Sequence, residues 1–279
     1  MNKRVMRFPM GRKKAVTLSY DDNMEEDKRL IALMEKYQMK GTFNLIPGWF
    51  AGEGTVYPRE ETYRLATESM AKDMYDHPLV EVANHGNEHK FMTTLSAAEM
   101  ADDTIACRKA LEKLFGRVVR GMAYPYGWYS KELQDVLAMC GIVYSRTVES
   151  TLQFDLPDEW LLWHPTCHHD DEKLMELTDE FLAMDVPDAP KLFYVWGHTY
   201  EFERNGNWDT FEVFMQKISG REDIWYATNV EIYDYVKAYE RLEISAGGTR
   251  IVNPSKMPVW LEIDGVVHKV EEEWVCQSE

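Results

Sequence analysis

Residues 15–23 read Ala-Val-Thr-Leu-Ser-Tyr-Asp-Asp-Asn, an apolar run that ends in two adjacent carboxylates. The apolar, β-branched part predicts a strand over residues 15–20, with Asp21 and Asp22 at its carboxyl end. Because neighbouring side chains of an extended segment point to opposite sides, one carboxylate can bind a metal ion while the other handles a proton. The alternative is structural: Asp22 or Asn23 caps a helix that begins at Met24.

A second polar group, His85-Gly86-Asn87-Glu88-His89, supplies two imidazoles four residues apart. Two such imidazoles can reach one ion from a single turn, and one carboxylate completes a set of three ligands. Taken alone, an H-x-x-x-H pair also arises by chance on exposed helices. Together the two motifs indicate a metal site that activates water for hydrolysis.

Apolar runs alternate with amphipathic stretches through most of the chain, which is typical of βα units and a parallel sheet. Strands are predicted over residues 15–20, 42–46, 79–83, 118–123, 142–146, 161–164, 192–196 and 223–227. Helices are predicted over residues 24–40, 59–75, 96–116, 130–139, 172–184, 208–219 and 230–242. About seven or eight units favour a (β/α) barrel, and the strand ends at Asp21, His85, Tyr124 and His198 would then meet at one mouth.

The pattern changes after residue 242 to short strands separated by turn residues. We therefore expect a barrel over residues 1–242 and a small β appendage over residues 243–279. Within the appendage, Asp264-Gly265 separates two alternating runs and predicts a hairpin. The appendage is expected to cover part of the barrel and to hold no catalytic residue.

Composition limits the partners of the chain. Its 279 residues include 31 basic and 48 acidic side chains, a net charge of -17, which disfavours binding to nucleic acid. No run approaches the roughly 20 apolar residues of a membrane span, and no signal-peptide core precedes the first strand. The four cysteines show no C-x-x-C spacing. These features predict a cytoplasmic protein without a membrane anchor.

Three further segments carry polar or aromatic residues near the predicted mouth: residues 120–127, residues 192–198 and residues 163–170. The first ends in Tyr124-Pro125-Tyr126-Gly127, and the second is an apolar strand that delivers His198. Each alone is most simply an ordinary βα turn or a buried histidine. Their order along the chain is more informative than any one of them.

The ordered set resembles the polysaccharide deacetylase family, also called the NodB-homology domain or carbohydrate esterase family 4. The family motif T-F-D-D-G is matched by residues 19–23, Ser-Tyr-Asp-Asp-Asn. Its H-[ST]-x-x-H motif is matched by residues 85–89, its P-Y-G motif by residues 125–127, and its late histidine by His198. The resemblance covers roughly residues 12–240 and implies a distorted (β/α) barrel of the deacetylase type with seven or eight units.

The resemblance also implies roles for individual residues. Asp22, His85 and His89 would hold a divalent metal ion, usually Zn²⁺. Asp21 would be the general base, and His198 the general acid. The backbone N–H of Tyr126 would help to hold the oxyanion. Around this centre, we expect the substrate cleft to be lined by Tyr124, Arg120, Trp163 and His164.

Several positions depart from the family pattern. Ala123 occupies the place of an arginine that pairs with the base, and Arg120 lies three residues earlier. Asn23 replaces a glycine, which requires a left-handed or similarly tolerant backbone. The histidine-rich residues 164–169 have no counterpart, and we expect them to line the cleft rather than to bind a second metal. Asp155, Asp158 and Trp160 loosely resemble the family element whose acid orients the catalytic histidine.

The sequence thus predicts a metal-dependent hydrolase that removes an acetyl group, preferably N-acetyl, from a carbohydrate. Two alternatives stay open: hydrolysis of a cyclic or small non-sugar amide, and a non-catalytic carbohydrate-binding barrel. A proton shuttle made of Asp21 and His198 is of no use to a binding module, which disfavours the latter. The expected partner is an acetylated saccharide, with a short saccharide favoured over a polymer.

Overall fold

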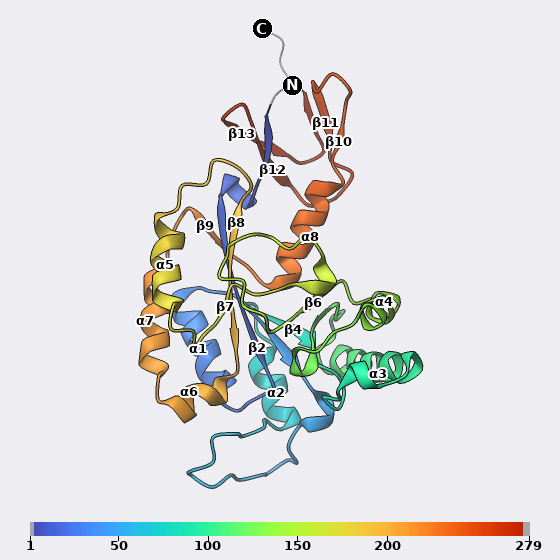
Figure 1. The fold of residues 1–279 in the computed structure, drawn as a ribbon, viewed down its shortest axis with the longest axis vertical. Coiled ribbons are helices and arrows are strands. Elements are labelled where there is room, and N and C mark those ends of the chain that lie inside the picture. Colours follow the sequence, from blue (N-terminus) through green and yellow to red (C-terminus); the bar gives the residue numbers. More distant parts are fainter. Residues whose placement is uncertain (1–2, 276–279) are drawn as a thin grey trace.

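The computed structural model describes residues 3–275. Parallel strands form a curled half-barrel in the order β6-β5-β4-β3-β2-β8-β7, and β9 pairs with the start of β2 (Figure 1). The strands are β2 (Lys14–Asp21), β3 (Gly41–Leu45), β4 (Val80–Asn84), β5 (Gly121–Ala123), β6 (Tyr144–Arg146), β7 (Cys167–His168), β8 (Lys191–Gly197) and β9 (Ile224–Tyr226). The predicted distorted (β/α) barrel is confirmed.

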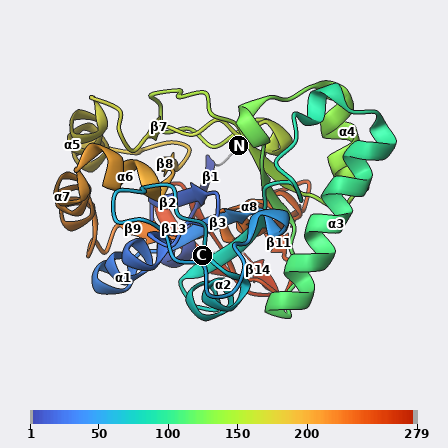
Figure 2. The same ribbon diagram turned by 90° about the horizontal axis from the view of Figure 1, so that it is seen from below.

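Helices pack around the outside of this sheet, as Figure 2 shows from below. They are α1 (Asp27–Tyr37), α2 (Glu68–Tyr75), α3 (Ala97–Phe115), α4 (Lys131–Met139), α5 (Leu174–Ala183), α6 (Thr199–Asn205), α7 (Trp208–Ile218) and α8 (Asn229–Glu240). The predicted capping box begins α3, where Ser96 and Glu99 bond reciprocally, and Gly116 ends it with a φ of 66°. No helix of residues 3–275 is long and apolar enough to cross a membrane.

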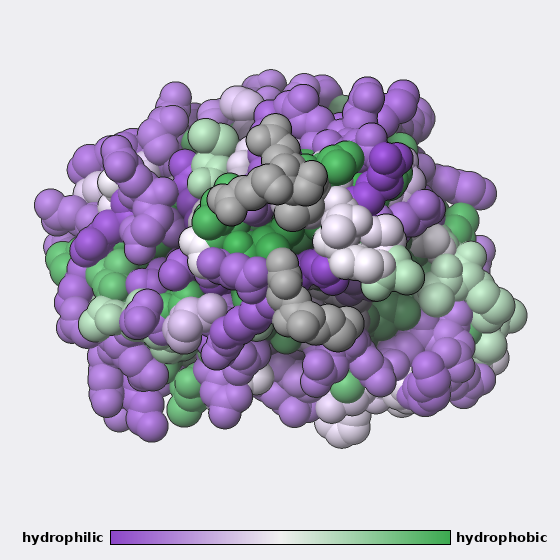
Figure 3. Space-filling view, turned by 90° about the horizontal axis from the view of Figure 1, so that it is seen from above, coloured by the Kyte–Doolittle hydropathy of each residue, from purple (hydrophilic) through white to green (hydrophobic). Residues whose placement is uncertain are grey.

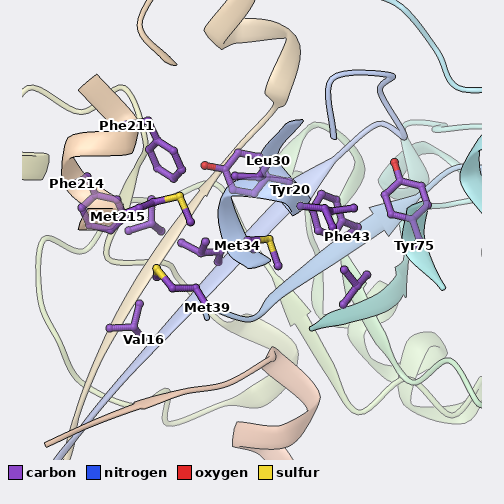
Figure 4. Packing of buried hydrophobic residues seen from close by; sticks show 14 of the residues in the cluster. Val16, Tyr20, Leu30, Met34, Met39, Phe43, Tyr75, Phe211, Phe214 and Met215 are labelled. Carbon is purple, nitrogen blue, oxygen red and sulfur yellow. The ribbon is translucent and has the colours of Figure 1, made fainter. Parts of the chain in front are cut away.

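The largest hydrophobic cluster joins the sheet to α1 and α7 (Figure 4). Leu30 and Met34 from α1 pack beside Tyr20 and Phe43, which come from β2 and β3. Phe211 of α7 meets the Tyr20 ring edge-on at 6.1 Å. Each fully buried side chain of this size contributes about 1.5–3 kcal/mol of transfer free energy. This packing fixes β2, and therefore the two carboxylates at its end.

The appendage contains two small antiparallel sheets. In one, β1 (Arg4–Arg7), β12 (Val259–Ile263) and β13 (Val266–Val270) pair in the order β1-β12-β13. The other contains β10 (Glu243–Ile244), β11 (Arg250–Val252) and β14 (Glu273–Val275). The hairpin between β12 and β13 turns at Asp264 and Gly265, with φ values of 48° and 86°, as its sequence predicted. The amino-terminal strand β1 was not predicted and joins the appendage to the start of the chain.

The appendage lies at the end of the barrel where β2 begins (Figure 1). Asp21 lies at the other end of β2, about 23 Å along an eight-residue strand. Figure 3 looks onto the appendage end, where hydrophilic residues surround a smaller hydrophobic patch near the centre of the view. The appendage therefore lies against the end of the barrel opposite the two carboxylates. It cannot close over the carboxylates.

Three element predictions need correction. Residues 161–164 do not form a barrel strand, because Trp160–Leu162 is a 3-10 helix and Trp163 makes only an isolated bridge to Arg146. The neighbouring strand is β7, a few residues later. The helix predicted from residue 59 begins only at Glu68, after Thr67 accepts from Met70 N as its N-cap. The short helix α6 directly after His198 was not predicted.

Candidate active site

A cavity of about 590 Å³ opens where the barrel strands end. Its volume is typical of small-molecule sites, which span about 300–1,000 Å³. It is lined by both motif carboxylates, the three predicted histidines and a set of aromatic residues: Asp21, Asp22, Trp49, Tyr63, His85, His89, Tyr124, Tyr126, Gly127, Val148, Trp196, His198 and Tyr200. The residues at the ends of β2, β4, β5 and β8 thus meet at one mouth.

Asp22, His85 and His89 converge on one point. His85 Nε2 lies 3.2 Å from His89 Nε2 and 3.6 Å from Asp22 Oδ1, and His89 Nε2 lies 3.9 Å from Asp22 Oδ1. His85 Nδ1 lies 2.8 Å from the carbonyl of Ala123, which can only accept, so Nδ1 carries the proton and Nε2 keeps its lone pair. Asp22 Oδ1 is buried and has no hydrogen-bond partner among the described residues.

This donor set fits a divalent cation. Ligand atoms about 2.0–2.2 Å from a tetrahedral ion are about 3.4 Å apart, close to the three separations found here. Burial lowers the pKa of His89 to about 3, which keeps its ring in the neutral form that coordinates metals. A buried carboxylate oxygen facing two imidazole nitrogens is poorly paired without a shared positive charge.

The backbone of the site adopts unusual conformations. Asp22, Asn23, His89 and Tyr126 have φ values of 77°, 45°, 50° and 58°, in the left-handed region that non-glycine residues seldom adopt. Asn23, which stands where the family has glycine, also accepts a hydrogen bond from Ile46 N through its side chain at 2.8 Å. Such strain is held by surrounding contacts and gathers at functional sites.

Asp21 is paired differently from Asp22. Arg146, at the end of β6, donates to its Oδ2, and Asn44 donates to its Oδ1 at 2.8 Å. Burial acts to raise the pKa of Asp21, but the charge and hydrogen bond of Arg146, together with the nearby His85 and His198, outweigh burial and lower the pKa. Asp21 is therefore held ionised.

Arg146 replaces the arginine that the sequence lacks at position 123. The parallel register of β5 and β6 makes Ala123 and Arg146 direct neighbours, so the guanidinium reaches Asp21 from the next strand. Arg120, proposed for the cleft, does not line the cavity, because both of its terminal nitrogens bond Asp234 at 3.0 and 2.6 Å. Sequence alone does not show this substitution, because it depends on the strand register.

His198 faces both carboxylates, with Nε2 lying 3.9 Å from Asp21 Oδ2 and 4.0 Å from Asp22 Oδ2. Its Nδ1 lies 3.1 Å from Glu201 Oε2, and its backbone N–H donates to the same oxygen at 2.9 Å. Burial disfavours the imidazolium, but Glu201 and the two aspartates outweigh it and raise the pKa of His198 to about 9. His198 can therefore carry a proton toward the cavity.

The acid that orients His198 is Glu201, three residues later in the first turn of α6. The resemblance had suggested Asp155, Asp158 and Trp160 instead. Asp155 pairs with Lys191 at 2.5 Å, and Asp155 and Asp158 line a separate cavity. Trp160 packs edge-on against Trp163, with ring centroids 4.9 Å apart.

The histidine-rich segment divides between two places. His164 Nδ1 lies 2.6 Å from Thr147 Oγ1, and His164 lines the separate cavity rather than the mouth. His168 Nδ1 accepts the backbone N–H of Asp170 at 3.1 Å, so its Nε2 carries the proton and donates to Glu201 at 3.1 Å. With that lone pair occupied, His168 supports Glu201 and is poorly suited to a second metal site. The expectation that this segment lines the cleft was wrong.

Aromatic residues form most of the cavity wall. Tyr124 and Tyr126 lie there as expected, whereas Trp163 is only 1% exposed and packs against Tyr144. Tyr63 was missed by the sequence analysis, and its hydroxyl donates to Asp22 Oδ2 at 3.2 Å. It lies in the segment that was expected to be helical, which hid its position.

Comparison with known proteins agrees with this geometry. Residues 9–145 match the model of the polysaccharide deacetylase family. The resemblance predicted from the motifs is confirmed. No curated protein matches the sequence.

Several solved structures share the fold at low sequence identity. A candidate polysaccharide deacetylase from Mycobacterium smegmatis is 16% identical, with a TM-score of 0.59 over 86% of this chain and 96% of that one. The family 4 carbohydrate esterase of Streptomyces lividans, solved with acetate, is 15% identical, with a TM-score of 0.50 over 77% and 93%. A mutant with restored activity of a family 4 pseudoenzyme from Bacillus anthracis is 19% identical, with a TM-score of 0.52 over 78% and 67%. The comparisons support a deacetylase.

Proposed function

We propose that this protein is a metal-dependent deacetylase that hydrolyses an N-acetyl group on a carbohydrate. The observation that carries the proposal is the division of the cavity floor. Asp22 Oδ1, which has no hydrogen-bond partner among the described residues, faces the Nε2 atoms of His85 and His89, while Asp21 and His198 each have a fixed, charged partner. Cation binding and proton transfer are thus assigned to different side chains, as hydrolysis by an activated water requires.

Asp22, His85 and His89 would hold the ion. A divalent metal such as Zn²⁺ supplies Lewis acidity for the carbonyl and makes a water molecule more acidic. Asp21, kept ionised by Arg146, accepts a proton from the attacking water as the carbon–oxygen bond forms. His198 Nε2 gives its proton to the leaving nitrogen as the carbon–nitrogen bond breaks. The products are acetate and the free amine.

The residues around these groups prepare them for these roles. Glu201 fixes the His198 ring so that Nε2, and not Nδ1, faces the cavity. Tyr126 stands beside His89, with ring centroids 4.3 Å apart, and its backbone N–H is our candidate for the oxyanion donor. Trp49, which is partly exposed in the cavity wall, offers an aromatic face on which a sugar ring can stack.

One observation favours a second candidate, hydrolysis of a small non-sugar amide. Tyr63 and Tyr200 meet at a ring separation of 5.0 Å over one side of the cavity, which suits a compact substrate. Such a substrate would use the same ion and the same two proton carriers. The choice between the candidates therefore rests on the leaving group, not on the catalytic residues.

Metal analysis combined with acetate release tests the proposal. The purified protein should bind one equivalent of divalent metal and release acetate from N-acetylated saccharides faster than from O-acetylated ones. Activity confined to small non-sugar amides would favour the second candidate. If neither class is hydrolysed although metal is bound, the chain is a non-catalytic barrel and the proposal is wrong.

A further inference from the structure

The cavity mouth differs on its two sides. On the side of β4 and β5, Tyr126 lines the cavity and is 45% exposed, and its neighbours Phe91 and Trp128 are 47% and 62% exposed. Phe91 and Tyr126 stack in parallel, with ring centroids 3.9 Å apart. On the side of β2 and β8, Tyr63 and Tyr200 are only partly exposed and touch each other. The sheet order separates these sides, since β3 lies between β4 and β2.

Tyr63 is held in place from two directions. Its hydroxyl bonds Asp22, and its ring meets the Tyr200 ring edge-on at an interplanar angle of 69°. The Tyr200 ring lies 5.3 Å from the His198 ring, directly after the strand that carries the histidine. The tyrosine pair thus stands beside Asp22 and the proposed acid, His198.

The chain around Tyr63 is anchored to the turn that follows the two carboxylates. Arg64 O accepts from Glu25 N at 2.8 Å, and Arg64 Nε donates to Glu26 at 2.5 Å. The next residues continue this contact, because Leu65 bridges Met24 in antiparallel fashion. Figure 2 looks into this end of the barrel, where the segment between β3 and α2 runs beside α6. Tyr63 therefore forms a fixed wall rather than a free loop tip.

We propose that Tyr63 and Tyr200 form a terminal wall that sets substrate length, so that the enzyme deacetylates a short saccharide or the terminal sugar of a chain. This inference rests on the proposed function. The reacting sugar ends against the tyrosine pair, and any further sugars leave across Tyr126 and Trp128. An internal sugar of a polymer, which continues in both directions, meets the wall and is excluded.

Acetate release should be measured on N-acetylated saccharides of one to six sugars and on the insoluble polymer. The wild-type enzyme should act on short substrates and on the terminal sugar only, with the polymer at least about 100-fold slower. Tyr63→Ala and Tyr200→Ala should each raise kcat/KM for internal sugars at least about tenfold, because they open the wall. Product mapping by mass spectrometry distinguishes terminal from internal deacetylation.

Two matched variants separate the wall from other effects. Tyr63→Phe keeps the ring but loses the bond to Asp22, so metal affinity, measured by calorimetry, should fall by about tenfold while the length profile is unchanged. Trp128→Ala, on the open side, should raise KM for longer saccharides without admitting internal sugars. The inference would be overturned if Tyr63→Ala and Tyr200→Ala, with folding and metal binding intact, kept the same dependence of activity on saccharide length as the wild type. A wild-type enzyme that hydrolyses no saccharide would instead refute the proposed function.

Discussion

The floor of the cavity has two halves, which differ in whether their polar atoms have a charged protein partner. In the cation half, formed by Asp22, His85 and His89, burial raises the pKa of Asp22 and its Oδ1 has no protein partner in residues 3–275. In the proton half, formed by Asp21 and His198 with their partners Arg146 and Glu201, each titrating group has an opposite charge beside it. Adjacent carboxylates thus acquire different chemistry from their surroundings alone.

The largest expected effect comes from breaking the cation half. His89→Ala removes one of three converging donors and should abolish stoichiometric metal binding, with acetate release falling at least about 1,000-fold. Metal content and activity should be measured on the same sample. His268→Ala is a suitable control, because His268 lies in the appendage, where its Nδ1 accepts from Trp274 Nε1 at 3.0 Å. Full metal content in His89→Ala would show that the ion lies elsewhere.

Breaking the proton half should separate catalysis from metal binding. Asp21→Asn retains the shape of the side chain but cannot take a proton, so the rate should fall about 100-fold or more while the metal content stays at one equivalent. Calorimetric titration with the metal alongside steady-state kinetics checks both parts. If Asp21→Asn were fully active, a group other than Asp21 would be the general base.

The two halves also differ in how far the sequence predicts them. Asp22, His85 and His89 lie within short motifs at strand ends, so spacing and family resemblance were enough to bring them together. Arg146 and Glu201 were missed because their roles depend on tertiary structure. Arg146 acts through the register of β6 beside β5, and an acidic residue three positions after an N-cap, as Glu201 is after His198, is typical of an ordinary helix N-terminus.

Element boundaries account for the remaining errors. The sequence gives no sign that the chain near Trp163 turns inward as a 3-10 helix, because its apolar run resembles a strand. The predicted helix over residues 59–75 placed Tyr63 on a helix surface, although that segment is irregular and reaches the cavity. The barrel itself was predictable, since alternating βα units strongly restrict the topology.

The position of the arginine can be tested by moving it. Arg146→Ala leaves the buried Asp21 without its guanidinium, so we expect a rate lower by about 10- to 100-fold and a loss of about 3–5 kcal/mol in the free energy of unfolding. Adding Ala123→Arg to this variant restores the family arrangement on the adjacent strand. The double variant should be at least about tenfold faster than Arg146→Ala alone. Chemical denaturation and kinetics measure the two effects. If the double variant folds and binds metal but is no faster than Arg146→Ala, Arg146 does not take the role of the arginine that the family has at position 123.

A smaller effect is expected from the partner of His198. Glu201→Gln keeps a side chain of the same size but removes the negative charge that holds the imidazole, so kcat should fall about tenfold with little change in KM. His168→Ala leaves the carboxylate with one donor fewer and should lower kcat only about two- to threefold. Equal losses in both variants would indicate that the two histidines share the role assigned to His198.

Glu81, inside the barrel, provides the smallest test, because it is a buried carboxylate that forms no ion pair within residues 3–275. Tyr144 and Thr42 donate to it at 2.7 and 2.8 Å, yet burial raises its pKa to about 7. Between the unfolded value near 4.5 and about 7, the folded state binds more protons than the unfolded state, so stability falls as pH rises through this window. The contribution of Glu81 to that fall is about 3 kcal/mol at most.

Glu81→Gln removes this titration while retaining a polar side chain of the same size. Its free energy of unfolding should depend less on pH than that of the wild type between about pH 4.5 and 7, and the variant should be the more stable of the two at pH 8. Urea denaturation at several pH values measures this difference. Asp21 is ionised because Arg146 lies beside it, whereas Glu81 has no ion pair within residues 3–275 and is expected to be protonated by burial alone. If the free energy of unfolding depended on pH in the same way in wild type and variant, burial alone would not set the charge of Glu81.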